Sequence, residues 1–326
     1  MNRRELVLAL VCLFGAPLAA EAQPAGTVAR IGFLGGGLPS TSKANIEGLR
    51  RGLRDLGYME GRDFILDFRW GEGRNDQLVE LAAELVRAHV HVIVTAGEPA
   101  IRAAQKATAT VPIVMGAAGD PVGAGFAASL ARPGGNITGV SNLAVEMTGK
   151  WLELLREAVP RLSYVAVLWN PASPTHHAFW KEAQAAARKM GVRSLGIEFG
   201  SPDDFEKGFA TMALERVDGL LVLPDPVTGS NRAKLAELLA KRRLPGIALF
   251  RESAEAGFLL SYGVSAFDNH RRAAAYVDKI LKGARPGDLP IEQGTKFELV
   301  INLKTAKSLG LAIPQSVLVR ADDLIQ

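Results

Sequence analysis

The sequence predicts an α/β protein built from two doubly wound lobes. Short apolar runs rich in β-branched residues alternate with stretches whose apolar residues recur at helical spacing. This alternation of strand and helix is typical of parallel sheets covered by helices. The alternation begins again after residue 140, and the chain has 326 residues, whereas a single core stops growing at roughly 250–300 residues. We therefore expect two lobes of similar size that are joined near residue 140.

The first lobe is expected to alternate strands and helices up to residue 118. Its strands are expected at residues 28–34, 63–70, 90–95 and 111–115. Its helices are expected at residues 41–56, 75–88 and 99–107. Gly57 follows the first helix, where a glycine commonly ends a helix, and Asn75 stands where a side chain caps the second. Pro99 fits the first turn of the third helix, a position that needs no N–H donor.

The stretch GDPVGAGFAASLARPGGNITGV, residues 119–140, joins the two lobes. It begins with an Asp-Pro turn, and the apolar spacing that follows predicts a short helix over residues 123–131. A tight turn at residues 132–136 precedes a β-branched run at residues 137–140. We expect the first part to form a wall of a cleft and the last part to cross between the lobes.

The second lobe repeats the same order. Its strands are expected at residues 164–169, 192–199, 219–223, 246–250, 259–262 and 297–301. Its helices are expected at residues 147–158, 174–190, 202–215, 232–243, 267–282 and 303–309. Ser201 stands where a side chain would cap the third of these helices. The run at 164–169 is almost wholly apolar, as is typical of parallel strands that are buried on both faces.

The N-terminus has the features of a secretory signal peptide. Arg3 and Arg4 precede an apolar stretch at residues 6–20, and Ala22 closes an Ala-x-Ala cleavage signal. We expect residues 1–22 to be removed during export to the periplasm. Cys12 is the only cysteine of the chain, so the exported form is expected to have no disulfide, no thiolate nucleophile and no cysteine-bound metal.

Composition and motifs argue against a nucleic-acid-binding protein or an enzyme. The net charge is only +4, and its basic residues lie in amphipathic helical patterns, which are typical of solvated faces. Residues 35–37 are glycines, but Ser40 replaces the third glycine of a dinucleotide fingerprint, and there is no P-loop or G-x-S-x-G motif. The paired histidines lack an acidic partner at metal spacing and are expected to be structural or exposed. They are His89, His91, His176 and His177. We expect no catalytic residue, metal or cofactor.

Candidate ligand contacts follow the strands, because ligands of doubly wound sheets bind outside the carboxyl ends of the strands. Ser40, Thr41 and Ser42 supply hydroxyl groups beside a helix start, where N–H groups favour an anion. They can equally cap their own helix. Ala96 and Gly97 lead into another helix start.

Three acidic side chains stand in these loops. Glu98 precedes Pro99 at a helix start, where the dipole stabilises a carboxylate; it either pairs with a ligand ammonium or faces solvent. Asp120 and Asp225 each precede a proline at comparable positions of the two lobes. Either can hold a ligand amine, or can form a turn by accepting hydrogen bonds from its own backbone.

Several long segments of the chain resemble a known family. They are ATATVPIVMGAAGDPVGAGFAASLARPGGNITGVS (107–141), AVLWNPASP (166–174), LPDPV (223–227), SYGVSAFDNHRRAAAYVDKILKGARPGDLPIEQGTKFELVINLKTAKSLGLAIPQS (261–316) and RADDLI (320–325). The chain resembles the periplasmic substrate-binding proteins of ABC importers, in the group described as tryptophan/tyrosine-type. The resemblance covers essentially the whole exported chain.

The resemblance implies a type I periplasmic-binding architecture. It consists of two Rossmann-like lobes with parallel sheets, three hinge crossings and a central cleft that closes on a ligand by hinge motion. No catalysis is implied, and the ligands that are understood among relatives are aromatic amino acids. This chain departs from the usual pattern at Glu98, where a small hydroxylated residue is common, in the loop 227–231, and at Gly294, which replaces a common proline.

The sequence thus predicts an exported receptor that passes a small polar ligand, an amino acid or related metabolite, to an ABC permease. Lobe 1 is expected to comprise residues 27–140 and about 263–288, and lobe 2 residues 141–262 and about 289–326. We expect the second lobe to contact the ligand through Asn170 and Asp225. Tyr262 is expected either to stack on the ligand near a hinge or to pack in the core. The protein is expected to be a monomer.

Two other interpretations remain open on the sequence alone. A ligand sensor for a membrane receptor would have the same sequence features. A two-lobed Rossmann-type enzyme, such as an epimerase or dehydrogenase, is disfavoured by the missing dinucleotide fingerprint and by the export signal.

Overall fold

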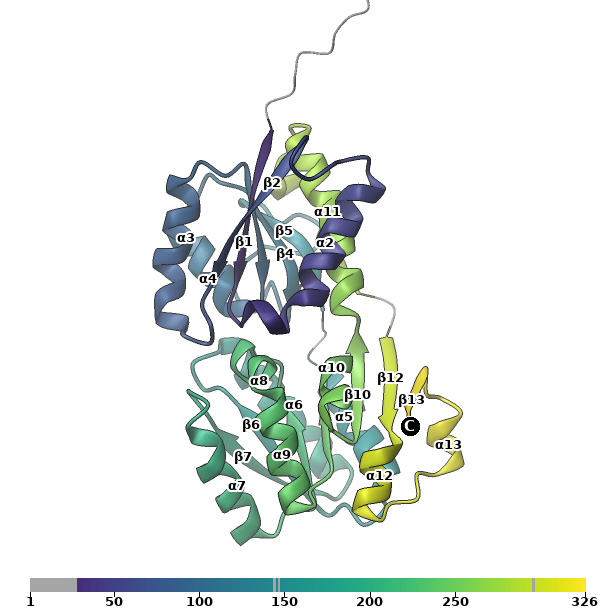
Figure 1. Ribbon diagram of the computed structural model, residues 1–326. Coiled ribbons are helices and arrows are strands. Elements are labelled where there is room, and N and C mark those ends of the chain that lie inside the picture. Colours follow the sequence, from purple (N-terminus) through teal and green to yellow (C-terminus); the bar gives the residue numbers. More distant parts are fainter. Residues whose placement is uncertain (1–27, 143–144, 146, 295–296) are drawn as a thin grey trace, which may run out of the picture.

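The computed structural model describes residues 28–142, 145, 147–294 and 297–326. These residues form two lobes, each a sheet with helices on both faces (Figure 1). The predicted signal peptide, residues 1–22, lies outside the described residues. Among the described residues, no helix is both long and apolar enough to cross a membrane.

The first lobe contains six strands in the order β11-β5-β4-β3-β1-β2, and all its neighbouring strands are parallel. The strands are β1 (Ala29–Gly35), β2 (Phe64–Trp70), β3 (Val92–Ala96), β4 (Ile113–Ala118), β5 (Ile137–Ser141) and β11 (Glu292–Gln293). The helices beside them are η1 (Pro39–Thr41), α2 (Lys43–Asp55), η2 (Asn75–Gln77), α3 (Leu78–Arg87), α4 (Glu98–Ala107), α11 (Ala266–Leu281) and η3 (Pro286–Asp288).

Two hydrophobic clusters bury the two faces of this sheet. Leu85 of α3 and Ile101 of α4 pack on one face, and Leu53 of α2 and Val277 of α11 pack on the other. Alternate residues of the central strands β3 and β4 therefore enter different clusters, so these two strands are almost wholly apolar and do not alternate in polarity. Helix α11 comes from far along the chain, yet it lies beside α2 in the same lobe (Figure 1).

The second lobe contains seven strands in the order β13-β12-β10-β9-β8-β6-β7. The strands are β6 (Tyr164–Trp169), β7 (Arg193–Glu198), β8 (Gly219–Val222), β9 (Gly246–Ala248), β10 (Leu260–Val264), β12 (Phe297–Asn302) and β13 (Asp323–Ile325). The helices are α5 (Met147–Ala158), α6 (Pro174–Lys189), α7 (Asp204–Glu215), α8 (Pro226–Ser230), α9 (Arg232–Arg242), α10 (Arg251–Ala256), α12 (Leu303–Leu309) and α13 (Gln315–Leu318). The sheet is parallel except that β10 and β12 are antiparallel.

In the described part of the chain, three connections pass between the lobes: β5 to α5, β10 to α11, and β11 to β12. Asn269 of α11 donates a hydrogen bond to Asn142, which directly follows β5, so two of the connections are tied together. Residues 137–140 are not themselves a crossing, because they lie inside the first sheet as part of β5. The chain also leaves the first sheet later than the expected boundary near residue 289, because β11 pairs with β5.

The helix expected at residues 123–131 is absent, and that prediction was wrong. The segment forms turns, in which the N–H of Ala124 donates to the carbonyl of Asp120 and that of Phe126 to the carbonyl of Pro121. Gly125 adopts a positive φ of 73°, which a right-handed helix cannot include. The apolar spacing reflects the burial of Phe126 and Ala127 against the first lobe's core.

Other local predictions differ from the structure by short segments. The side chains of Asn75 and Ser201 do not cap α3 and α7, whose caps are Gln77 and Asp203. The strand expected at 246–250 ends at Ala248. The short elements α8, α10, α13, β11 and β13 were not expected, because a window of two to six residues carries too few apolar positions to show a period.

Candidate functional site

A cavity of about 160 Å³ lies between the lobes, where the carboxyl ends of both sheets meet. The loop after β3 and the start of α2 line it from the first lobe, and the loops after β6, β8 and β9 line it from the second. Of the residues proposed from the sequence, Thr41, Ser42, Ala96, Gly97, Glu98 and Asp225 line the cavity. Topology explains the position, because the strands of the first sheet and β6 to β10 of the second direct their carboxyl ends toward the other lobe.

The two lobes touch at the rim of this cavity. Pro226, the first residue of α8, fits against two glycines of the first lobe: a Cβ at Gly36 would lie 2.8 Å from its ring, and one at Gly97 would lie 2.9 Å from it. The N–H of Leu38 also donates to Ser230 Oγ at 3.1 Å. Only glycine allows so close an approach at these two positions.

Hydroxyl groups of the first lobe line the cavity beside α2. Thr41 Oγ1 and Ser42 Oγ both donate to the carbonyl oxygen of Leu38, at 3.1 and 3.0 Å. Neither makes a side-chain cap to its helix. The N-terminus of α2, with its unpaired N–H groups, therefore faces the cavity beside these oxygens. Ser40 is exposed and does not line the cavity.

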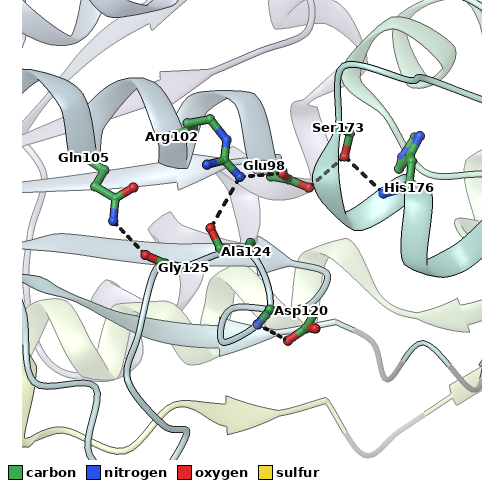
Figure 2. Close-up of polar contacts among 9 residues, drawn as sticks. Glu98, Arg102, Gln105, Asp120, Ala124, Gly125, Ser173 and His176 are labelled. Atoms are coloured by element: carbon green, nitrogen blue, oxygen red, sulfur yellow. Dashed lines mark hydrogen bonds and ion pairs between the residues drawn. The ribbon is translucent and has the colours of Figure 1, made fainter.

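Glu98 joins the two lobes. Its Oε1 accepts a hydrogen bond from Arg102 at 2.9 Å, one turn along α4, and its Oε2 accepts one from Ser173 Oγ of the second lobe at 3.0 Å (Figure 2). Arg102 also lies over the ring of Phe126, with its Cζ 4.9 Å from the ring centroid. The carboxylate is thus held from both sides and does not face bulk solvent.

Asp225 is the buried carboxyl group of the cavity, with 8% of its surface exposed. Its Oδ1 accepts from the N–H of Val227 at 2.8 Å, and its Oδ2 accepts from Asn170 Nδ2 at 3.2 Å. Burial raises the pKa of the Asp225 carboxyl, and nearby Glu98 raises it further, against the lowering effects of His176 and of the two hydrogen bonds. Asn170 itself lies behind Asp225 and does not line the cavity.

His176 is buried and neutral, and it orients the loop that precedes α6. Its Nδ1 accepts the N–H of Asn170 at 2.9 Å, so the proton is on Nε2, which lies 3.1 Å from the carbonyl oxygen of Pro224. Burial lowers its pKa, although Asp225 opposes the shift. The prediction of a structural histidine fits this arrangement, but the same ring also lines the cavity.

Several cavity residues were not among the candidates from the sequence, and two of them, His270 and Thr175, are buried polar side chains. His270 of α11 is fully buried; its Nδ1 donates to the carbonyl of Ala266 at 2.9 Å, and burial lowers its pKa to about 4. Thr175 of α6 is buried, and its Oγ1 has no hydrogen-bond partner among the described residues. His270 lies inside α11 and follows no strand directly, so the rule that directed attention to post-strand loops passed over it. Thr175 does lie in the segment after β6, but it was not singled out there.

Two predicted contacts lie away from the cavity. Asp120 Oδ1 accepts the N–H of Gly123 at 2.9 Å, which is the turn-forming alternative (Figure 2). The ring of Tyr262 stacks on Phe297 with centroids 5.8 Å apart, and its carbonyl accepts from Trp151 Nε1. These contacts correspond to the core-packing alternative for Tyr262.

The cavity offers polar recognition groups and no metal site. In residues 28–142, 145, 147–294 and 297–326, no cluster of histidine, cysteine or acidic side chains has the geometry to hold a metal ion. Its charged and polar groups come from both lobes, so a small molecule between them would contact both at once. Phe179 and Phe250 add apolar surface from the second lobe.

Comparisons with known proteins agree on one family. The family described as ABC transporter substrate binding protein matches residues 39–325. The chain is 26% identical over 274 residues to a tyrosine-binding protein of Clostridioides difficile, across 84% of this chain and 78% of the relative.

Two solved structures are similar over nearly the whole chain. A conserved domain protein from Vibrio cholerae has a TM-score of 0.86 at 28% identity and covers 91% of this chain and 100% of its own. An ABC domain from Streptococcus pneumoniae in complex with L-Trp has a TM-score of 0.86 at 26% identity and covers 92% of this chain and 100% of its own. The type I periplasmic-binding architecture predicted from the sequence is confirmed.

Proposed function

The chain belongs to the family of ABC transporter substrate-binding proteins, and we propose that it captures an amino acid with an apolar or aromatic side chain and delivers it to a membrane permease. We place the protein in the periplasm, which it would reach by export with removal of residues 1–22. The observation that carries the proposal is the cavity between the lobes, with a buried carboxyl group on one side and a helix N-terminus on the other.

Each end of an amino acid has a suitable partner in this cavity. We assign the ligand ammonium to Asp225, whose carboxyl group has hydrogen-bonding capacity beyond its two observed donors. We assign the ligand carboxylate to the N-terminus of α2, beside Thr41 and Ser42, because N–H groups and the helix dipole favour an anion there. Phe179 and Phe250 would pack on the ligand side chain. The named ligands of two relatives, tyrosine and L-Trp, support this class.

Hinge motion is the proposed means of capture. We propose that the two sheets move as lobes about the connections near Asn142, Ser265 and Gly294, and that the contacts of Pro226 with Gly36 and Gly97 form on closure. Since a ligand held by both lobes binds the closed form better, it shifts the population toward that form. A single chain contains both halves of the cavity, which is consistent with a functional monomer.

Thermal unfolding with and without amino acids tests the function. A ligand at a hundred times its Kd should add about 2.7 kcal/mol to the free energy of unfolding. We expect L-tyrosine, L-tryptophan or L-phenylalanine to raise the melting temperature and charged amino acids to leave it unchanged. Stabilisation by nucleotides alone would contradict the proposal.

Asp225→Asn tests the assigned ammonium contact. We expect at least a tenfold weaker Kd by calorimetry, about 1.4 kcal/mol. Asparagine keeps one acceptor oxygen but places an NH2 donor against Val227 N–H or Asn170 Nδ2, which both donate to Asp225. Thermal melting of the ligand-free variant therefore verifies that it is folded before binding is measured. Asp120→Asn is the matched control and should bind normally, since Asp120 lies outside the cavity. Equal affinity of the Asp225 variant and the wild type would refute the assignment.

A further inference from the structure

The contact between Glu98 and Ser173 places a carboxylate of the first lobe against a helix end of the second. Ser173 is the N-cap of α6, a helix of 16 residues; its Oγ accepts the N–H of His176 at 3.3 Å and donates to Glu98 Oε2 at 3.0 Å (Figure 2). A helix N-terminus favours an anion through its free N–H groups and its dipole. In this protein, the anion nearest to that end is the protein's own side chain.

A second observation shows that this helix end faces the ligand cavity. Thr175, in the first turn of α6, is 6% exposed and lines the cavity, and its Oγ1 has no partner among the described residues. A buried hydroxyl without a partner is costly, so a ligand atom or a water is the expected partner. The Glu98 carboxylate therefore stands beside a hydrogen-bonding position that is open to the ligand.

The carboxylate is held in a fixed position. Only 13% of the Glu98 side chain is exposed, and Arg102 binds its other oxygen. Arg102 in turn lies over the ring of Phe126. Its Nη2 also donates to the carbonyl oxygen of Ala124 at 3.5 Å (Figure 2). Glu98 and Ser173 also line an outer groove that includes Arg102. The pair thus forms part of the wall between the cavity and this groove.

We propose that Glu98 is a specificity-determining residue, which occupies the N-terminus of α6 with its own carboxylate and so excludes ligand carboxylates from the second lobe while favouring a ligand amine there. This inference rests on the proposed function, because it concerns the same cavity. Glu98 and Asp225 interact electrostatically, so a ligand ammonium between Thr175 and these carboxylates would be attracted by both. A ligand acid in that position would be repelled by both.

Three probes that share one ring separate these effects: L-tyrosine, tyramine, which has only the amine, and 3-(4-hydroxyphenyl)propionate, which has only the acid. We expect the wild type to bind L-tyrosine and tyramine and to bind the acid at least a hundredfold more weakly than L-tyrosine, as measured by calorimetry. Glu98→Gln, which keeps the shape, and Glu98→Ser, which opens the helix end, should each lower the ratio of acid Kd to tyramine Kd at least tenfold.

Two controls locate the effect. Glu80→Gln removes a charge from the exposed surface of α3, outside the cavity, and should leave the ratio within threefold of the wild type. Arg102→Gln added to Glu98→Ser tests whether the released Arg102 attracts the acid. We expect the double variant to keep the lowered ratio of acid Kd to tyramine Kd. Circular dichroism establishes that each variant is folded.

The outcomes distinguish the two proposals. The role of Glu98 at α6 would be overturned by an unchanged ratio in both Glu98 variants or by an equal change in the Glu80 variant. A return of the double variant to the wild-type ratio would also overturn it. A wild type that binds tyramine but no amino acid would contradict the proposed function and leave the role of Glu98 intact. A wild type that does not bind tyramine would overturn the Glu98 proposal, whether or not L-tyrosine binds.

Discussion

Three ionisable side chains of one cavity illustrate how environment sets their behaviour. Glu98 is held between Arg102 and Ser173. Among the described residues, Asp225 accepts hydrogen bonds from neutral donors, and burial raises its pKa. His270 is buried and has no charged partner in that part of the chain, and its pKa falls to about 4. The pKa values of the two cavity histidines are thus lowered by burial, and the other ionisable groups that line the cavity are carboxyl groups and Arg232.

His270 should make the protein sensitive to acid. Its pKa falls from an ordinary 6.5 to about 4 on folding, so between these values the unfolded chain takes up a proton that the folded protein does not. The contribution of His270 to the free energy of unfolding is therefore fully present above pH 6.5 and is lost as the pH falls toward 4. A shift of this size corresponds to about 3 kcal/mol.

Urea unfolding of the wild type and of His270→Gln at pH 7 and pH 4.5 measures this contribution. Gln can still donate to the carbonyl of Ala266 but does not titrate. The free energy of unfolding should fall less on acidification in the variant than in the wild type. His176 contributes in the same direction in both proteins, so it cancels in the comparison, and equal losses would show that His270 is not responsible.

At the scale of elements, the packing of α11 on α2 depends on two glycines. A Cβ at Gly48 would lie 2.2 Å from the carbonyl oxygen of Phe267, and one at Gly52 would lie 2.3 Å from that of Arg271. The helices approach so closely because these positions carry no side chain. This contact joins a helix near the start of the chain to one near its end, and it holds α11 in the first lobe.

Gly52→Ala should therefore destabilise the protein, although alanine favours helices. We expect a loss of about 1–3 kcal/mol, the usual cost of overpacking. Gly149→Ala in α5 is the matched control, because its nearest neighbour would be an ordinary contact at 3.7 Å; it should stabilise by about 0.5–1 kcal/mol. Thermal and denaturant unfolding measure both, and the same sign for the two substitutions would contradict this account.

At the scale of the whole molecule, neither lobe is a continuous piece of chain. The core face that α2 and β1 form is completed by Ala273, Ala274, Val277 and other residues of α11, and β11 adds the edge strand beside β5. The lobes are thus linked through three connections in the described chain and not through one.

A fragment of residues 28–141 should consequently fail to fold cooperatively. It would expose the apolar face of α2 that α11 covers, and burial of apolar surface is the main favourable contribution to folding. The matched control is the same fragment joined by a Gly/Ser linker to residues 265–293, which restores α11 and β11. Calorimetric unfolding distinguishes them: we expect a cooperative transition for the joined fragment only, and a cooperative transition for both would refute the argument.

Local patterns in the sequence determined most of the elements of this protein and its fold class. The apolar spacing at residues 147–158 and 164–169 coincides with α5 and β6, because burial against a sheet or in its middle leaves a periodic trace in the residues themselves. The same trace was misleading at residues 123–131, where two buried side chains in a turn imitated a helix. The post-strand rule also located Glu98, Asp225 and Thr41 at the cavity.

Only the tertiary structure decided what those residues contact. Asp120 and Asp225 have the same local setting, an Asp-Pro after a strand, and each accepts a backbone N–H a few residues further on. Of the two, however, Asp225 is the one that is buried and lines the cavity. Glu98 and Ser173 are separated by 75 positions, and their hydrogen bond depends on how the lobes meet. Periodicity reports that a face is buried but not which partner buries it, so the placement of α11 and the contacts across the cavity depend on long-range packing that no local pattern encodes.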